Sequence, residues 1–440
     1  MYRVRHCRQR RNIYRVRREN MDKVILAKNI ILDGELGHTR PNDNQMIFGG
    51  TGSGKSMSIV LPTLCHMKDS SLIGTFAKKS VVSNAVAYFQ NLGYKTYVWN
   101  LANPKKGDKI PDPLSYVNSD DDVQELARQI ANGNPEYSRA TKFDPYWREA
   151  SESLITGLIY YVLMTADSPS MKKVIDLFYQ VKIKEDGRAI STSVDYIFEW
   201  LQNKAPNSIA ARKLSSFAQL PYATAGCVRD DLEKAIQNIF PVSIQKAMSE
   251  YAFVNFEEFS TDRTAIFILT SPVRTVQYGF ANLLFSIAIR HLMEFAETQK
   301  DNHLPRDVKL VFDDFSCGFA IQNYEKSIST FRAAGISSLM LCQSLSQLDA
   351  TYGQENATVI LDNCASLVYL PGGMNQQTAS YIAKMLDLPL NDVMFMPMGN
   401  VVVFQSGQQP VIAPRYETLK DPLYQKLMAA GEEKGELRSA

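Results

Sequence analysis

The sequence has no long apolar segment, and this absence excludes a membrane-spanning helix. No stretch approaches the roughly 18 consecutive apolar residues by which such helices are recognised. The most apolar stretches, such as residues 264–268 and 338–342, are no longer than a buried strand. The chain also begins with arginines instead of the apolar core of a secretory signal, so we do not expect export.

Cysteine and histidine are scarce, with six and five residues among 440. The cysteines are scattered without a C-x-x-C pair, and no two histidines have ligand spacing, which argues against a zinc site or a disulfide framework. Apolar residues (45%) and charged residues (21%) occur in proportions typical of soluble globular proteins. A chain of this length is too long for one small core, so we expect two domains.

Positive charge is concentrated at the start of the chain. Residues 1–20 contain eight arginines and one acidic residue, Glu19, whereas residues 21–440 contain 40 basic and 45 acidic residues. The residues could form an arm that binds anionic lipid or nucleic acid. The alternatives are a disordered tail, or a start assigned too early, since Met21 follows at once. Because the body is slightly acidic, we expect any DNA contact to be local, in a channel or a loop.

The stretch MIFGGTGSGKSMSIV, residues 46–60, contains the phosphate-binding pattern G-x-x-x-x-G-K-[ST]. A short apolar run precedes the pattern and apolar residues at helical spacing follow it, as in a strand, a glycine loop and a helix. Backbone N–H groups of such a loop can point at a phosphate, and the helix N-terminus adds partial positive charge. The predicted nucleotide-binding residues are Gly49, Gly50, Thr51, Gly52, Ser53, Gly54, Lys55 and Ser56.

Two of these residues carry specific roles in P-loop proteins. Lys55 would reach the β- and γ-phosphates, and the Ser56 hydroxyl would hold Mg²⁺. The sequence therefore predicts ATP and Mg²⁺ as cofactors. The alternative is a glycine-rich turn that binds nothing.

Strand and helix patterns alternate in two separate parts of the chain. The first part has strand patterns at residues 46–48, 71–75 and 95–100 and a helical pattern at 81–92. The second part has a helical pattern at 280–298 and strand patterns at 264–270, 309–312, 337–342, 365–370 and 400–405. This alternation predicts an α/β fold with a mostly parallel sheet that is covered on both faces.

Residues 119–250 show almost no strand pattern. Helical patterns there cover residues 121–131, 146–164, 172–179, 194–201 and 209–217. We expect an all-α domain inserted into one α/β domain. The predicted division is a disordered basic arm (1–20), the first part of a nucleotide-binding domain (21–118), the inserted domain (119–250), the second part of the nucleotide-binding domain (251–425) and a C-terminal tail (426–440).

The stretch KLVFDDF, residues 309–315, ends an apolar strand with two carboxylates. A P-loop ATPase needs a carboxylate at the end of a neighbouring strand to orient Mg²⁺, and Asp313 fits this role. The next residue usually polarises the attacking water and is commonly glutamate, whereas Asp314 has about 1.5 Å less reach. Because phosphoryl transfer depends on positioning, we expect slow hydrolysis unless the backbone shifts inward. The alternative for the pair is a solvated turn.

Two further polar residues are candidates for the same site. Gln343 follows the strand pattern at 337–342 and could sense the γ-phosphate or orient water, although a surface glutamine is the alternative. Arg332 could complete the site of a neighbouring subunit, because its planar fork meets phosphate oxygens in pairs. An arginine that satisfies carbonyls at a helix C-terminus is the equally open alternative.

The order of these motifs resembles that of the type IV coupling proteins of bacterial conjugation and type IV secretion. The resemblance covers most of residues 25–418 and includes landmarks beyond the P-loop. These are DPYWRE (144–149), NYEK (323–326), FRAAGI (331–336), QSLSQL (343–348), Asn363–Cys364, and the stretch from MPMGN (396–400) to Arg415–Tyr416.

The resemblance implies a RecA-like ATPase that assembles as a homo-hexamer. Such a protein hands a relaxase bound to DNA, expected to be single-stranded, or a protein substrate to the channel of a type IV secretion system. The resemblance implies catalytic roles for Lys55, Asp313, Gln343 and Arg332, the last acting in a neighbouring subunit. It also implies Mg²⁺ binding by Ser56 and Asp313, and substrate recognition by the helical insertion.

The sequence departs from the family pattern in three places. Members usually begin with two membrane helices, and this sequence contains no such apolar stretch. We expect a cytoplasmic protein, which would dock at the inner face of the cell membrane through residues 1–20 or a membrane partner. The second strand usually ends in T-D-P-K-G-E, whereas residues 75–80 read TFAKKS, which keeps Thr75 and Lys78 but neither acid. The third departure is Asp314 in place of glutamate.

Three functions remain open from the sequence. The leading hypothesis is a coupling ATPase whose hydrolysis drives DNA transfer. The second is a nucleotide-binding recruitment adaptor with little hydrolysis, which the missing acids and Asp314 favour. The third is a DNA-pumping ATPase of segregation or packaging.

Overall fold

The computed structural model describes residues 22–33, 41–105, 107–134, 144–183, 192–271, 273, 276–373 and 375–436. The predicted basic arm, residues 1–20, therefore lies outside the described residues. In the part of the chain that is described, no helix is long and apolar enough to cross a membrane.

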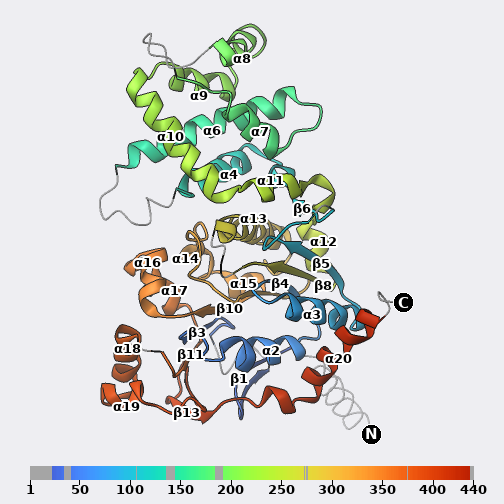
Figure 1. The fold of residues 1–440 in the computed structure, drawn as a ribbon, viewed down its shortest axis with the longest axis vertical. Helices are drawn as coiled ribbons and strands as arrows, with labels where there is room; N and C mark the ends of the chain where they lie inside the picture. The colour runs from blue at the N-terminus through green and yellow to red at the C-terminus, as the bar shows by residue number, and fades with distance from the viewer. Residues whose placement is uncertain are drawn as a thin grey trace.

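A nine-stranded sheet forms the centre of the α/β part (Figure 1). Its strands, in spatial order, are β13, β12, β11, β3, β10, β9, β4, β8 and β5. Seven strands from β11 to β5 pair in parallel, while β12 and β13 add antiparallel pairs at one edge. The bounds are β3 (Gln45–Gly49), β4 (Ser71–Phe76), β5 (Lys95–Asn100), β8 (Thr264–Leu269), β9 (Val308–Phe312), β10 (Ile336–Cys342), β11 (Ser366–Leu370), β12 (Asn400–Gln405) and β13 (Val411–Pro414).

The predicted α/β class with a mostly parallel sheet is confirmed. Each of the eight predicted strand patterns corresponds to one strand of this sheet, with bounds that differ by at most one residue at either end. The hairpin that adds β13 was not predicted. Its residues alternate little in polarity, and three of its four side chains are exposed at the edge of the sheet.

Both faces of the sheet are covered, as the continuous burial of its central strands requires. Along β3, Met46 and Phe48 join the apolar cluster on one face, and Ile47 joins the cluster on the other. The second face is covered by β1 (Lys23–Ala27), β2 (Ile30–Asp33), η1 (Ser56–Val60), α2 (Leu61–Cys65), α3 (Lys79–Asn91) and α20 (Pro422–Glu436).

The first face carries α13 and most of the remaining helices. Figure 1 shows α13 lying between the sheet and a separate group of helices, α4 and α6 to α11. The helices near the sheet are α12 (Phe256–Thr261), α13 (Val276–Thr298), α14 (Tyr324–Ser327), α15 (Phe331–Ala334), α16 (Leu345–Tyr352), α17 (Gln354–Asp362), α18 (Gln376–Leu386) and α19 (Leu390–Met394). Short 3₁₀ turns are η2 (Pro113–Tyr116), η3 (Glu250–Ala252) and η4 (Thr418–Lys420).

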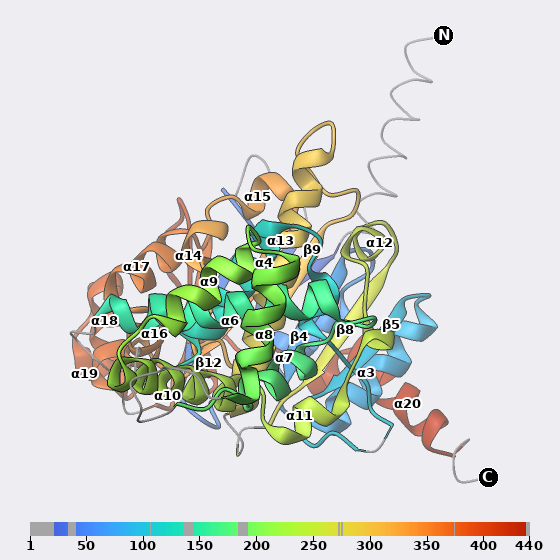
Figure 2. The same ribbon diagram turned by 90° about the horizontal axis from the view of Figure 1, so that it is seen from above.

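The second group of helices, here called the helical segment, falls within residues 120–247. Viewed from above, it lies over the α/β part (Figure 2). Its helices are α4 (Asp120–Asn132), α6 (Pro145–Thr165), α7 (Met171–Phe178), α8 (Thr192–Lys204), α9 (Ile209–Ala218), α10 (Tyr222–Ile239) and α11 (Val242–Ala247). We did not predict α10, whose first turns, YATAG, contain small residues and a glycine instead of a regular apolar stripe.

The two ends of the helical segment meet at a short parallel pair of strands. The chain leaves the sheet after β5, and β6 (Ile110–Pro111) pairs with β7 (Met248–Ser249) just before the chain returns through α12 to β8. Because β5 and β8 are neighbours in the sheet, the whole segment is carried on one edge. One continuous apolar cluster joins it to the first face of the sheet.

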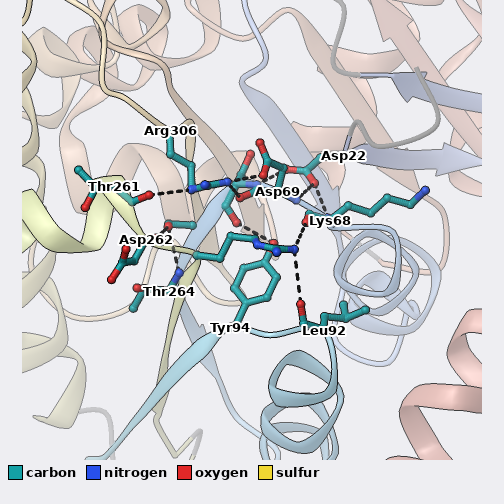
Figure 3. Close-up of polar contacts among 12 residues, drawn as sticks. Asp22, Lys68, Asp69, Leu92, Tyr94, Thr261, Asp262, Thr264 and Arg306 are labelled. Carbon is teal, nitrogen blue, oxygen red and sulfur yellow. Dashed lines mark hydrogen bonds and ion pairs between the residues drawn. The ribbon is translucent and has the colours of Figure 1, made fainter. Parts of the chain in front are cut away.

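The edge of the sheet where its parallel strands begin is closed by side chains that bind backbone groups (Figure 3). The Asp22 carboxylate accepts hydrogen bonds from three consecutive N–H groups, those of Lys68, Asp69 (2.9 Å) and Ser70 (3.0 Å). Arg306 donates to the carbonyl oxygens of Asp69 (2.9 Å) and Thr261 (3.3 Å). These contacts hold the amino-terminal ends of β4 and β9 together, on the side of the sheet away from the glycine loop.

Candidate functional site

The glycine loop lies at the carboxyl end of β3, where the backbone turns sharply. Gly52 and Gly54 have φ values of 77° and 86°, which only glycine adopts readily. A Cβ atom on Gly50 would lie 3.0 Å from the Cα atom of Gly373, so the loop also needs glycine for its close approach to the chain after β11. The sequence around the P-loop thus encodes a compact turn that depends on its glycines.

The helix after the loop begins with a π-helical turn, η1, and continues as α2. Ile59, Val60 and Leu64 are buried on the second face of the sheet, as the helical spacing predicted. The hydroxyl of Ser53 is buried and has no hydrogen-bond partner among the described residues. An unpaired buried hydroxyl carries an energetic cost, so this loop is suited to receive a polar ligand.

Ser56 and Asp313, separated by 257 positions in the chain, meet at the carboxyl edge of the sheet. The Ser56 hydroxyl donates a hydrogen bond of 2.6 Å to Oδ1 of Asp313. We predicted that the strands carrying these two motifs adjoin, and this is wrong. β10 lies between β3 and β9, and the turn that follows β3 reaches across the end of β10.

Lys55 lies within the loop and beside both carboxylates. Its ammonium group donates to the carbonyl oxygens of Gly49 and Gly50, the latter at 3.3 Å. Burial lowers the pKa of Lys55, whereas the charges of Asp314 and Asp313 act to raise it. The side chain is therefore held where a phosphate could replace the carbonyl contacts.

Asp313 is surrounded by donors from three parts of the chain. Burial raises the pKa of its carboxyl group, and the hydrogen bond from Ser56, the charge of Lys55 and the backbone N–H of Ala77 oppose that rise. The charge of Lys78 also acts to lower the pKa of Asp313. The loop at residues 75–80, whose role the sequence left in doubt, thus lies against the predicted magnesium ligand.

Asp314 and Gln343 also come together, and both connect to the glycine loop. The side chain of Gln343 hydrogen-bonds to Asp314, and its Oε1 accepts a hydrogen bond of 3.1 Å from the Thr51 hydroxyl. Burial and the neighbouring Asp313 raise the pKa of Asp314, while Lys55 and the hydrogen bonds to its carboxylate oppose this. Gln343 stands at the end of β10, between the strands that carry the other two motifs, and so bridges them.

Arg332 lies elsewhere. It is an exposed residue of α15, just before β10 begins, while Gln343 follows the end of the same strand. Arg332 and Lys55 are therefore at opposite edges of the sheet within one subunit. Its predicted role in a neighbouring subunit's site stays a prediction.

Arg415, to which the sequence assigned no role, contacts the glycine loop directly. Its guanidinium group donates to the carbonyl oxygens of Ser53, Pro371 (3.3 Å) and Asn400 (3.5 Å). It thereby ties the loop after β3 to the ends of β11 and β12. The Arg415–Tyr416 pair was noted as a landmark, but its spacing from the P-loop gave no signal of this contact.

The donor set suits a polyphosphate with a hard divalent cation. The hydroxyl of Ser56 and the carboxylate of Asp313 are oxygen ligands of the kind that Mg²⁺ prefers. The positive φ values of Gly52 and Gly54 allow the backbone to curve, and a curved loop of this kind can present N–H groups to an anion. In chemical terms the site can bind phosphate oxygens, hold a cation beside them and orient a water through Asp314 and Gln343.

Three comparisons identify similar proteins. The sequence model of a family described as "Type IV secretory system Conjugative DNA transfer" matches residues 6–387. Conjugal transfer protein TraG of Agrobacterium fabrum is 22% identical over 368 residues, which cover 81% of this chain and 52% of that protein. The chain thus spans about half the length of this curated relative.

Solved structures share the fold at low sequence identity. The bacterial conjugative coupling protein TrwB lacking an N-terminal segment matches with a TM-score of 0.64 and 15% identity, covering 86% of this chain and 87% of that one. Plasmid coupling protein TrwB in complex with ADP and Mg²⁺ matches with a TM-score of 0.62, 16% identity and coverage of 86% and 87%. VirB4 of Thermoanaerobacter pseudethanolicus matches with a TM-score of 0.56, 13% identity and coverage of 91% and 97%.

Proposed function

The chain belongs to the type IV secretory system conjugative DNA transfer family, and on this premise we propose that it is an ATP-binding and ATP-hydrolysing coupling protein. It recruits a relaxase–DNA complex or a protein substrate to a type IV secretion or conjugation channel and drives DNA transfer. The observation that carries this proposal is the contact between Ser56 and Asp313 beside Lys55. Residues far apart in the chain converge there into the parts of one nucleotide site.

The proposed roles follow from the positions of the side chains. Residues 49–56 hold the phosphates, with Lys55 at the β- and γ-phosphates, and Ser56 with Asp313 holds Mg²⁺. Asp314 orients the attacking water, and Gln343 senses the γ-phosphate through its contacts with Asp314 and Thr51. When bound, ATP would supply the phosphoanhydride bond that is broken, and Mg²⁺ would neutralise negative charge on the phosphate oxygens. The TrwB complex with ADP and Mg²⁺ supports this choice of cofactor.

Assembly is the second part of the proposal. A homo-hexamer would bring Arg332 of one subunit to the P-loop edge of the next, which explains why this arginine lies far from Lys55 within the subunit. In this proposal residues 21–118 and 251–425 form the nucleotide-binding domain, residues 119–250 recognise cargo, and residues 426–440 form a tail. Residues 1–20, or a membrane partner, hold the ring at the inner face of the cell membrane.

ATP turnover tests this function most directly. Turnover per subunit is measured against protein concentration, with and without single-stranded DNA, for the wild type and for Lys55→Ala. Lys384→Ala, which changes an exposed lysine on α18, is the matched control. We expect turnover that rises with protein concentration and is abolished only in Lys55→Ala. Wild-type turnover no greater than that of Lys55→Ala would refute the ATPase proposal.

One observation favours a second candidate, the recruitment adaptor with little hydrolysis. Asp314 has a short side chain, and burial together with Asp313 disfavours its charged form. In this case nucleotide binding would organise the ring while another ATPase supplies power. The DNA-pumping alternative has no comparable support, and co-purification with a relaxase or a channel component would argue against it.

A further inference from the structure

Tyr278, near the start of α13, lies against the predicted hydrolytic carboxylate. The phenol is 2% exposed, and its hydroxyl donates a hydrogen bond of 3.3 Å to Oδ2 of Asp314. The same hydroxyl accepts from Oγ1 of Thr270, also at 3.3 Å. Thr270 is fixed in turn by its own N–H, which donates to the carbonyl oxygen of Phe76 at 3.0 Å. Tyr278 therefore connects Asp314 to the residue that follows β8.

These contacts continue along the carboxyl edge of the sheet, from the end of β8 to the loop that follows β3. From Thr270 after β8 they pass through Tyr278 to Asp314 after β9, then through Gln343 after β10 to Thr51 in the glycine loop. Every member is a polar side chain held by its neighbours. A shift at one end changes the geometry at the hydrolytic carboxylate, because the members are linked by hydrogen bonds of defined direction.

The start of α13 is fixed rigidly to the turn that follows Asp314. Gly318, with φ of 81°, packs so closely that a Cβ atom there would lie 2.9 Å from Cβ of Tyr278. Asn282 donates from Nδ2 to the carbonyl oxygens of Cys317 (3.0 Å) and Phe319 (2.6 Å). Tyr278 and Asp314 thus belong to one preorganised unit.

The other side of the same helical turn touches the helical segment. A Cβ atom on Gly279 would lie 2.9 Å from the carbonyl oxygen of Asn238, at the end of α10. The contact is between backbones, which cannot yield as a flexible side chain can. Any movement of α10 toward α13 must therefore displace the turn that carries Tyr278.

We infer that Tyr278 is a positioning residue for Asp314 and that it transmits the position of α10 in the helical segment to the hydrolytic carboxylate. The inference rests on the proposed ATPase function and adds a route by which cargo at the helical segment regulates turnover. Tyr278 touches neither nucleotide nor water in this scheme. It acts by setting the direction of a carboxylate that is one methylene shorter than the usual glutamate.

The length of the hydrogen bond makes it a sensitive control point. At 3.3 Å it is longer than the roughly 2.7 Å at which a hydroxyl and an ionised carboxylate bond most strongly. A displacement of α13 by a few tenths of an ångström would tighten or break it. A water held by a misdirected carboxylate loses its alignment with the phosphorus atom, which lowers the rate of the chemical step without changing nucleotide binding.

The first test removes only the hydroxyl. Tyr278→Phe is compared with Tyr324→Phe, which deletes another buried hydroxyl, one that donates to Ser338 at 2.7 Å. We expect kcat for ATP to fall about tenfold in Tyr278→Phe, as for loss of a hydrogen bond to a charged group. KM and the amount of ADP bound per subunit should stay unchanged. If Tyr278 only stabilised the fold, Tyr278→Phe would instead lower the amount of ADP bound per subunit. Equal kcat in Tyr278→Phe and wild type would overturn the inference.

The second test perturbs the contact with the helical segment. Gly279→Ala adds a Cβ atom that meets the carbonyl oxygen of Asn238 (2.9 Å) and the ring of Phe319 (3.1 Å). Gly226→Ala adds one in α10 where nothing lies within 4 Å. We expect kcat to fall severalfold in Gly279→Ala alone, and Gly279→Ala to have no further effect when Tyr278→Phe is present. The same loss in both backgrounds would show that α10 does not act through Tyr278.

The two proposals fail in different ways. A wild type that binds ATP but does not hydrolyse it refutes the proposed ATPase function and with it this inference. A wild type that hydrolyses ATP while Tyr278→Phe and Gly279→Ala match it leaves the ATPase function intact and overturns the inference alone.

Discussion

Replacing Arg415 with alanine should weaken nucleotide binding without unfolding the protein. The arginine donates to three carbonyl oxygens. Its hydrogen bonds to those of Ser53 and Pro371 connect the glycine loop to the end of β11. The third contact, to Asn400 at 3.5 Å, is at the limit of a hydrogen bond. Without the guanidinium group the loop keeps its glycines but loses the tie that fixes it against the neighbouring strands.

The size of the effect follows from the two better contacts. A hydrogen bond from a charged donor contributes about 1.5 kcal/mol at the low end, which suits a side chain that is only partly buried. Two such hydrogen bonds contribute about 3 kcal/mol. If all of this free energy holds the loop in the conformation that binds nucleotide, its loss lowers the affinity roughly 100-fold. Arg415→Lys should fall between wild type and alanine, because an ammonium group cannot span carbonyls that the planar fork reaches together.

The assay is titration of Mg²⁺–ADP by calorimetry, with circular dichroism to check the fold. Arg212→Ala, at an exposed position of α9, is the control and should leave the affinity unchanged. An affinity of folded Arg415→Ala within about twofold of wild type would show that the glycines alone fix the loop. If Arg415→Ala and Arg415→Lys both unfold, the arginine is needed for the stability of the domain and not specifically for the glycine loop.

Three further predictions concern hydrolysis, assembly and stability. Asp314→Glu should change ATP turnover: a large gain indicates an attenuated site, and a loss indicates that the aspartate is already fitted to its surroundings. Arg332→Ala and Lys55→Ala should each be inactive alone. A mixture should recover turnover, because Lys55→Ala subunits supply the arginine and Arg332→Ala subunits supply the intact P-loop. A mixture that stays inactive argues against a role of Arg332 in a neighbouring subunit. Burial and the charge of Arg290 lower the pKa of His291 below its ordinary value of 6.5. The unfolded chain therefore binds the proton more readily than the folded protein does. As a result, stability should fall as the pH drops through about 6.5. His291→Phe should reduce the difference in melting temperature between about pH 8 and about pH 5, and an unchanged difference would contradict this origin.

The sheet could be predicted because its signals are local. Each central strand is a short apolar run between breaking residues, and each run encodes its own burial whatever its neighbours are. Two of the elements that we missed, β13 and α10, carry weak local signals. β13 has mostly exposed side chains, and α10 begins with small residues. Their structures depend on the edge and the core that they join.

The individual residues of the candidate nucleotide site were chosen from the sequence, and their roles stay predictions. Gly52 and Gly54 are required by backbone conformation, and Lys55 and Ser56 follow them at fixed spacing. Asp313 was a candidate because a P-loop ATPase needs a carboxylate at the end of a strand to orient Mg²⁺, and Asp313 ends such a strand. These inferences need only a few neighbouring residues.

What the sequence by itself determined is thus the central strands of the sheet and the polar residues at their ends. The tertiary structure alone decided the order of the strands, which puts β10 and its glutamine between the loop and the acidic pair, and leaves Arg332 on the far edge. It alone brought Arg415 to the loop and Tyr278 to Asp314. The physical reason is that such contacts join side chains across strands and layers, where hydrogen-bond direction and close packing select the partner and no spacing along the chain records it.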